Sequence, residues 1–194
     1  MVLPLVGGLV SFGIGEGLLV VAHWGSTPWT VFAQGLSKQL HLSIGFSTAL
    51  ISCAVLLAWI PLKEKPGLGT LANLALIASA LDVTVAVVGR HHSLGLRMVF
   101  VGVALEAIAL GSALYLTTGL GPGPRDGLMT SLHRRLGISI VYVRAGIEGT
   151  VLVAGWLLGG VVGIVTAIFA LSIGFAIGWN LRIVASLATK KGSA

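Results

Sequence analysis

Long apolar stretches constrain the fold of this sequence more than any other feature. Six of them, each roughly 20 residues long, lie between clusters of charge at residues 3–22, 44–62, 69–88, 94–118, 138–159 and 163–187. About 20 apolar residues in a helix cross a hydrocarbon layer about 30 Å thick. Because lipid cannot satisfy open backbone groups, such spans must be helical. The sequence therefore predicts an all-α membrane protein with six transmembrane helices.

Composition excludes several other classes of protein. Only 9% of the 194 residues are charged and the mean hydropathy is +1.01, so a soluble enzyme or a disordered chain is excluded. The basic residues are spread among apolar runs, which favours membrane lipids over nucleic acid as partners. Cys53 is the single cysteine, and no metal-ligand spacing is present. We expect no metal, no cofactor and no enzymatic activity.

The distribution of lysine and arginine predicts the topology. In a six-span arrangement, eight basic residues lie on one side of the membrane: Lys63, Lys65, Arg125, Arg134, Arg135, Arg182, Lys190 and Lys191. Lys38, Arg90 and Arg97 lie on the other side. Since basic residues accumulate in cytoplasmic loops, both termini are expected in the cytoplasm.

The two halves of the chain are an internal repeat. A shift of 96 positions aligns them without a gap, matching Gly25 with Gly121, Pro28 with Pro124, Ser43 with Ser139, Gly67 with Gly163 and Thr70 with Thr166. The repeats cover approximately residues 3–88 and 94–187 of a single membrane domain, and residues 188–194 form a short basic tail. Each repeat contains three spans, so the second must be inverted relative to the first. Inverted repeats recur in secondary transporters, with a site near the bilayer midplane.

A short amphipathic connector follows the first span of each repeat. Ser26-Thr27-Pro28 opens the first connector and Gly121-Pro122-Gly123-Pro124 opens the second, and both patterns are typical of helix starts. Apolar residues then recur at every fourth position. Two arrangements fit this pattern: helices lying flat in the interface, or half-helices that dip inward with their N-terminal ends aimed at an anion.

The second connector begins with a charged pair, Arg125 and Asp126. Arg125 is a candidate bidentate contact for an anion, with Asp126 holding it or favouring the helix start. The alternative is that the two residues pair at the membrane surface. Trp29 occupies the position equivalent to Arg125 in the first repeat.

Ionisable residues inside spans are costly and are candidates for function. Arg144 and Glu148 stand four residues apart on one helical face, which predicts either a self-neutralising pair or a substrate anchor with its orienting partner. The candidate substrate-binding residues are thus Pro28, Trp29, Pro124, Arg125, Asp126, Arg144 and Glu148.

Three further acids lie in spans without a cation nearby in the sequence. They are Glu16, Asp82 and Glu106, and we interpret them as candidate proton-coupling residues. Asp82 and Glu106 have a second interpretation, in which they pair with Arg90 or Arg97 near the end of a span.

Several segments resemble a known family of bacterial membrane proteins. GPGPRDGLM at 121–129, RAGIE at 144–148 and GWLLGG at 155–160 resemble the YczE-like integral membrane proteins, relatives of the YitT group. PW at 28–29, SIG at 43–45 and PGLGT at 66–70 resemble the first-repeat pattern of the same family. The resemblance implies a multi-pass protein of the bacterial inner membrane that is suspected of transport.

The sequence departs from the pattern expected of that family at three positions. Thr30 stands where an acid often follows Pro-Trp, which makes the two connectors chemically unequal. Val165 replaces an expected glycine and Phe175 an expected proline, and both changes favour a straighter last span.

These observations together predict a secondary transporter or exporter of a small anionic or zwitterionic metabolite. Coupling to protons and assembly as a homodimer are two further expectations. Two alternatives stay open. One is a substrate-capturing membrane subunit of a multi-subunit transporter. The other is a lipid-binding membrane protein without transport activity, which would bind anionic lipid through Lys38, Arg134 and Arg135.

Overall fold

Helices account for the secondary structure of the described chain. The structure is a computed structural model that describes residues 2–89 and 93–191. Within these ranges the helices are α1 (Val2–Ala22), α2 (Pro28–Leu40), α3 (Ile44–Leu62), α4 (Leu68–Val88), α5 (Leu94–Leu116), α6 (Pro124–Leu136), α7 (Ile140–Leu157) and α8 (Ile164–Lys191), and there is no strand. Arg90 of a predicted loop and residues 192–194 of the predicted tail lie outside the described residues.

The structure confirms the six predicted spans. Helices α1, α3, α4, α5, α7 and the part of α8 up to Ser186 are long and apolar enough to cross a membrane. Their bounds agree with the predicted windows to within two residues. The two remaining helices, α2 and α6, are the predicted connectors. The chain is a multi-pass membrane protein.

Local capping fixes where the connectors begin. Thr27 precedes α2, and its hydroxyl accepts a hydrogen bond from the Thr30 amide at 3.2 Å. Pro28 and Pro124 occupy the first positions of α2 and α6, where a missing N–H removes no intrahelical bond. Gly137 ends α6 with φ +66°, a conformation that glycine adopts without strain.

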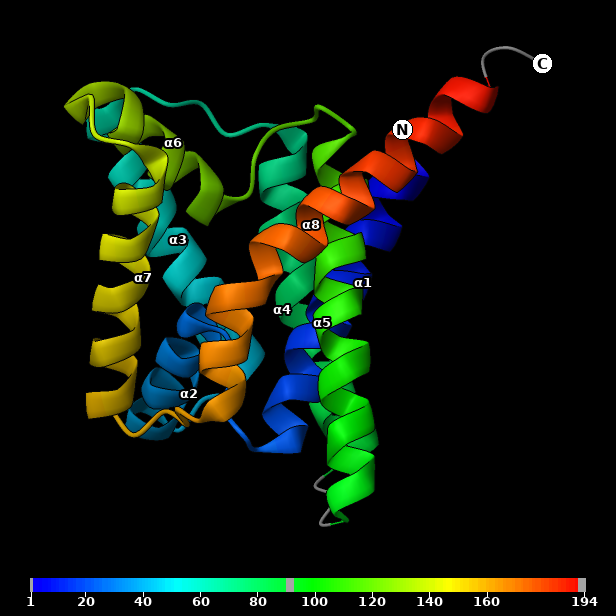
Figure 1. Ribbon diagram of the computed structural model, residues 1–194. Coiled ribbons are helices and arrows are strands. Elements are labelled where there is room, and N and C mark those ends of the chain that lie inside the picture. Colours follow the sequence, from blue (N-terminus) through cyan, green and yellow to red (C-terminus); the bar gives the residue numbers. More distant parts are fainter. Residues whose placement is uncertain (1, 90–92, 192–194) are drawn as a thin grey trace.

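The helix boundaries repeat at the offset of the sequence repeat. Helices α2 and α6 start 96 residues apart and both contain 13 residues. Helices α3 and α7, and likewise α4 and α8, also start 96 residues apart. Figure 1 shows α2 at the bottom of the molecule and α6 at the top. The two connectors therefore lie at opposite ends, as inverted repeats require.

The first helices of the two repeats cross closely at the centre of the fold. A Cβ on Gly15 would lie 2.7 Å from the carbonyl oxygen of Ala104, and one on Gly111 would lie 2.5 Å from that of Gly8. Gly15 and Gly111 are equivalent in the two repeats, as are Gly8 and Ala104. The crossing of α1 and α5 thus has the same geometry from either side, and small residues let the two backbones approach.

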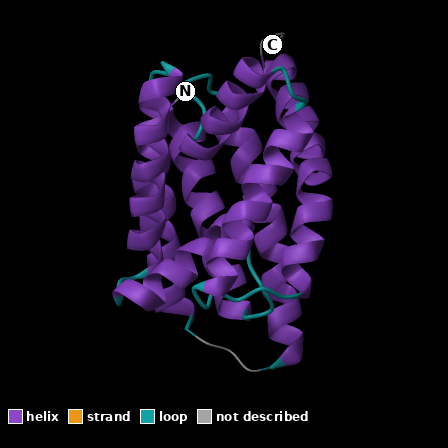
Figure 2. Cartoon of the chain, turned by 90° about the vertical axis from the view of Figure 1, so that its left-hand side faces the viewer, coloured by secondary structure: helices purple, strands orange, loops and turns teal. Residues whose placement is uncertain are grey.

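The connectors are held by spans of both repeats. Helix α2 packs on α3 and α7, and α6 packs on the same two helices. Helix α1 packs along α4 as well as α5, and α8 packs on α5. The start of α1 and the end of α8 lie at the same end of the molecule in Figure 1, and Figure 2 shows most helices running between its two ends. This arrangement brings the starts of α2 and α6 into the interior.

Candidate functional site

The first turns of α2 and α6 meet in a buried polar pocket. It has a volume of about 200 Å³, and every described helix contributes to its lining. Thr27, Pro28 and Trp29 come from the start of α2, and Arg125 and Asp126 from the start of α6. The connectors are therefore inward-directed half-helices. Their N-terminal ends, with free N–H groups and partial positive charge, face one space.

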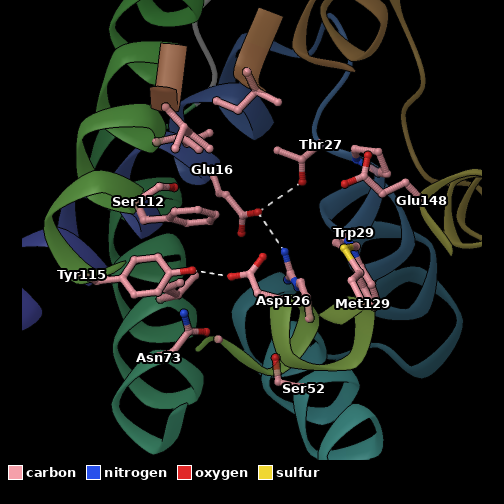
Figure 3. A pocket seen from close by; sticks show the side chains of 18 of the residues that line it. Glu16, Thr27, Trp29, Ser52, Asn73, Ser112, Tyr115, Asp126, Met129 and Glu148 are labelled. Carbon is pink, nitrogen blue, oxygen red and sulfur yellow. Dashed lines mark hydrogen bonds and ion pairs between the residues drawn. The ribbon is translucent and has the colours of Figure 1, made fainter. Parts of the chain in front are cut away.

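Glu16 of α1 lies at the centre of the polar pocket and is fully buried. One oxygen, Oε1, accepts a hydrogen bond from the Thr27 hydroxyl at 3.2 Å and forms an ion pair with the Arg125 guanidinium at 3.3 Å. Among the described residues, the other oxygen, Oε2, has no hydrogen-bond partner. Figure 3 shows the carboxylates of Glu16 and Asp126 facing the same space. Glu16 thus joins both half-helices and leaves one of its own oxygens without a partner in the described chain.

Arg125 pairs with Glu16 and not with its neighbour Asp126, so the predicted alternative of an Arg125–Asp126 pair at the surface is wrong. Asp126 instead accepts a hydrogen bond from the Tyr115 hydroxyl of α5. The two side chains leave the helix in different directions, because consecutive positions are about 100° apart around a helix of 3.6 residues per turn. Asp126 therefore fixes α6 against α5.

Trp29 faces Arg125 across the polar pocket. The guanidinium carbon lies 5.1 Å from the centre of the indole ring, a cation–π contact between equivalent positions of the two repeats. Trp29 is 6% exposed, and its indole Nε1 has no hydrogen-bond partner within the described chain. A buried donor without a partner is uncommon and costly. The Trp29 donor and the second Glu16 oxygen are thus two buried polar atoms in this lining without a partner among the described residues.

Arg144 and Glu148 complete the charged lining from α7. The Arg144 Nε donates to Glu148 Oε1 at 2.8 Å, which confirms the predicted pair. Both residues line the polar pocket, so the pairing does not remove them from the site. With Glu16, Asp126 and Arg125, the lining contains three carboxylates and two guanidinium groups.

Pro124 positions the site without lining it. Its carbonyl accepts a hydrogen bond from the buried Trp59 indole at 3.1 Å. Gly127 packs on the same indole ring so closely that a Cβ would overlap it. Helix α6 therefore lies flush against Trp59 of α3, and this contact sets the depth at which Arg125 enters the pocket.

Asp82 and Glu106 do not line the polar pocket. Asp82 of α4 accepts hydrogen bonds from the Ser43 hydroxyl at 2.5 Å and from the Gly45 amide at 2.7 Å, both at the start of α3. Glu106 lies exposed on α5. Of the three predicted coupling residues, only Glu16 faces the cavity. The reason is tertiary: a polar group inside a span finds a neighbouring helix, a cavity or the outer surface, and sequence does not distinguish these.

Asp82→Ala is expected to loosen the contact between α3 and α4 without changing the polar pocket. Two hydrogen bonds at a half-buried carboxylate are lost, together worth about 1–3 kcal/mol. The apparent melting temperature in detergent should fall by several degrees, while ligand binding at Arg125 is retained. An unchanged melting temperature, or a loss of binding equal to that of an Arg125 variant, would contradict this assignment.

Several lining residues were not identified from the sequence. Tyr115, Ser112, Asn73, Ser52 and Thr48 are uncharged, and single hydroxyl or amide groups inside apolar spans are common. Asn73, an amide near the start of a predicted span, was the most distinctive of them in the sequence. Among the described residues no group of three or more His, Cys, Asp or Glu side chains is placed to hold a metal ion.

Comparison with known proteins places the chain among uncharacterised membrane proteins. The model of a family of unknown function, DUF6198, matches residues 1–182. A Haemophilus influenzae protein is 48% identical over 179 residues, covering 92% of this chain and 82% of the relative. The Bacillus subtilis membrane protein YczE is 28% identical over 90% of this chain and 82% of its own length, and B. subtilis YyaS is 28% identical over 82% and 81%. No solved structure matches the chain significantly.

Proposed function

We propose a transport function for this chain, which belongs to the DUF6198 family of unknown function. The chain acts as a secondary transporter of a small zwitterionic compound in the bacterial inner membrane. One observation carries the proposal: two half-helices from inverted repeats end at a buried polar pocket whose central groups include an unpaired acceptor and an unpaired donor. Half-helix ends at a site between inverted repeats are the usual architecture of secondary transporters.

The charge of the polar pocket favours a zwitterion over a simple anion. Three carboxylates and two guanidinium groups line it, so an anion alone would add to the negative excess. A zwitterion satisfies both signs: its anionic group binds Arg125 and the two helix N-termini, and its cationic group binds a carboxylate such as Glu148.

Glu16 supplies a route for proton coupling. It shares the Arg125 guanidinium at 3.3 Å, and an anionic substrate group binding Arg125 competes for that contact. The Glu16 carboxylate then loses part of its counter-charge, which makes it the residue that we assign to proton coupling. Substrate and proton thus occupy the pocket together, and no other energy source is required.

The equivalent helix pairs of the two repeats are held together unequally, which suits alternating access. The Asp82 contact ties α3 to α4 in the first repeat. The equivalent position in α8 is Gly178, which has no side chain to tie α8 to α7. In inverted-repeat transporters the two repeats exchange conformations, so that the tightly packed side of the site becomes the loosely packed one and the site opens alternately to either side of the membrane. Because basic residues gather near α6, we assign the end of the molecule that contains α6 and both termini to the cytoplasmic side of the membrane.

The groups assigned to lipid binding in the alternative hypothesis have partners within the protein. Lys38 donates to the Gly159 carbonyl, Arg134 pairs with Glu64, and Arg135 donates to the Pro61 carbonyl at 2.8 Å. These contacts join helix ends and loops of the protein itself. They favour the transport proposal over capture of anionic lipid at the connectors.

A thermal-stability screen tests the proposal. The purified protein is heated with small zwitterions (amino acids, glycine betaine, glycerophosphoethanolamine), anions (succinate, inorganic phosphate) and cations (ethanolamine, choline), because a ligand that binds the folded state raises its stability. We expect a zwitterion to stabilise the wild type. Arg125→Ala should need about tenfold or more compound for the same effect, since a charge-assisted contact is lost.

Arg134→Ala is the matched control, because Arg134 lies on the same helix in an exposed ion pair. Any stabilising compound is then tested for uptake into proteoliposomes with and without a pH gradient. Equal stabilisation of Arg125→Ala and Arg134→Ala, or the lack of any stabilising compound, would contradict the proposal.

A further inference from the structure

A second cavity adjoins the polar pocket. This apolar groove has a volume of about 650 Å³ and lies between α3 and α7. Its lining is made by Trp29, Phe32, Leu36, Leu50, Ile51, Ala54, Val55, Ala58, Leu128, Gly146, Ile147, Thr150 and Val151. Thr150 is the only hydroxyl in this lining, and it bonds to the Gly146 carbonyl of its own helix. Apart from the Trp29 indole N–H, which has no partner among the residues that the structure describes, the groove lining is therefore apolar.

Trp29 lies between the two cavities, because it lines both. The same helices supply both walls: on α3, Ser52 lines the polar pocket and Ile51 the apolar groove, and on α7, Glu148 lines the pocket and Ile147 the groove. Polar and apolar surfaces thus lie on neighbouring faces of the same helices.

We propose, resting on the transport function above, that the substrate is a single-chain zwitterionic amphiphile of the lysophospholipid type. Its charged head occupies the polar pocket between Arg125 and the carboxylates, and its apolar chain lies in the groove between α3 and α7. The unpaired Trp29 Nε1 and Glu16 Oε2 stand where head-group oxygens and an ammonium group would bind. Trp29, which lines both cavities, carries the unpaired donor, and Glu16, which lines only the polar pocket, carries the unpaired acceptor.

The volumes of the two cavities fit a charged head group in the polar pocket and an apolar chain in the groove. At about 200 Å³ the polar pocket is smaller than the roughly 300–1,000 Å³ of ordinary ligand sites, so it holds a head group and not a whole amphiphile. The adjoining groove is about three times as large. A chain held in a groove along the spans stays in an apolar environment while the head moves through the polar pocket, which avoids exposing the chain to water.

The test compares three probes on the full-length protein in nanodiscs. Lysophosphatidylethanolamine carries head and chain, glycerophosphoethanolamine carries the head alone, and a monoacylglycerol of the same chain length lacks the charged head. We expect lysophosphatidylethanolamine to stabilise the protein at a concentration at least about tenfold lower than glycerophosphoethanolamine, because the bilayer concentrates it beside the protein and only its chain can contact the groove. The monoacylglycerol should give little stabilisation.

Two glycines of α7 provide matched variants. Both Gly146 and Gly149 have open space where a Cβ would be, but only Gly146 lines the apolar groove. Gly146→Phe should abolish the advantage of the lysophospholipid and preserve binding of glycerophosphoethanolamine. Gly149→Phe should behave as the wild type.

The outcomes separate this inference from the proposed function. Equal potency of the two head-bearing probes, or an unchanged lysophospholipid effect in Gly146→Phe, overturns the amphiphile assignment and leaves the transport proposal standing. Failure of both probes also overturns it, and the transport proposal then depends on the other zwitterions of the screen. A dimer in the wild type that Gly146→Phe converts to a monomer would show that a second copy covers the groove, and would overturn the inference too.

Discussion

Glu16→Gln is expected to lower the apparent melting temperature of the purified protein by about 10 °C. The substitution preserves the shape of the side chain and its contact with Thr27 but leaves the Arg125 guanidinium, whose side chain is only 16% exposed, without its counter-charge. Breaking a buried ion pair on one side costs about 3–5 kcal/mol, and 1 kcal/mol corresponds to about 2–4 °C in a chain of this size.

The double variant Glu16→Gln/Arg125→Gln is expected to recover at least half of that loss. Removing both charges leaves no unpaired ion in the polar pocket, and buried ion pairs can often be replaced by neutral groups at little cost. This recovery distinguishes an electrostatic effect from a simple packing defect. If the loss came from packing, the destabilisation caused by the second substitution would add to that caused by the first.

Glu64→Gln is the control for this pair, because it removes the same kind of charge from the exposed pair between Glu64 and Arg134. Exposed pairs contribute about 0–1 kcal/mol, so the melting temperature should change by a few degrees at most. If Glu16→Gln and Glu64→Gln unfold at the same temperature, or if the double variant is less stable than Glu16→Gln, the central role of the Glu16–Arg125 pair is wrong.

Gly111→Leu is expected to prevent the protein from folding. A Cβ at this position would lie 2.5 Å from the Gly8 carbonyl oxygen and 2.8 Å from the Phe12 amide nitrogen of α1. These atoms belong to the backbone of a helix and cannot turn aside as a flexible side chain would. Overpacking of a core typically costs about 1–3 kcal/mol when neighbours can adjust, and here the cost exceeds that range.

The measurement is the yield of monodisperse protein after detergent extraction, with the melting temperature of whatever folds. Gly102→Leu, on the same helix, is the matched control, because a Cβ there meets nothing within 4 Å. That variant should stay within about 0.5 kcal/mol of the wild type, as surface substitutions usually do. Equal yields and melting temperatures of the two variants would show that α1 and α5 do not depend on this close crossing.

The candidate site shows where inference from the sequence was limited. Arg125 was identified because it follows a helix-starting motif, and Arg144 and Glu148 because four-residue spacing brings side chains together on a helix. The partner of Arg125 was missed: Glu16 is 109 residues away, so no spacing rule connects them. Their meeting requires α6 to approach α1 inside the fold, which depends on the packing of α6 against Trp59.

The acids inside spans make the same point. Glu16, Asp82 and Glu106 looked alike in the sequence, yet one lies in the polar pocket, one binds the start of α3, and one is exposed on α5. A buried charge must find a partner, but which helix supplies it depends on how each span is rotated about its axis. Hydropathy does not record that rotation when nearly every side chain of a span is apolar.

The sequence by itself determined the number of spans, their bounds to within two residues, the repeat at an offset of 96 and the starts of both connectors. These features are local: helix length is set by the thickness of the bilayer, and helix starts by the residues that cap them. Only the tertiary structure decided that the connector N-termini point inward, that Glu16 pairs with Arg125, and that an apolar groove adjoins the polar pocket. The physical reason is that these features arise where distant helices pack against one another, and small residues such as Gly8 and Gly111 permit that packing without specifying it in advance.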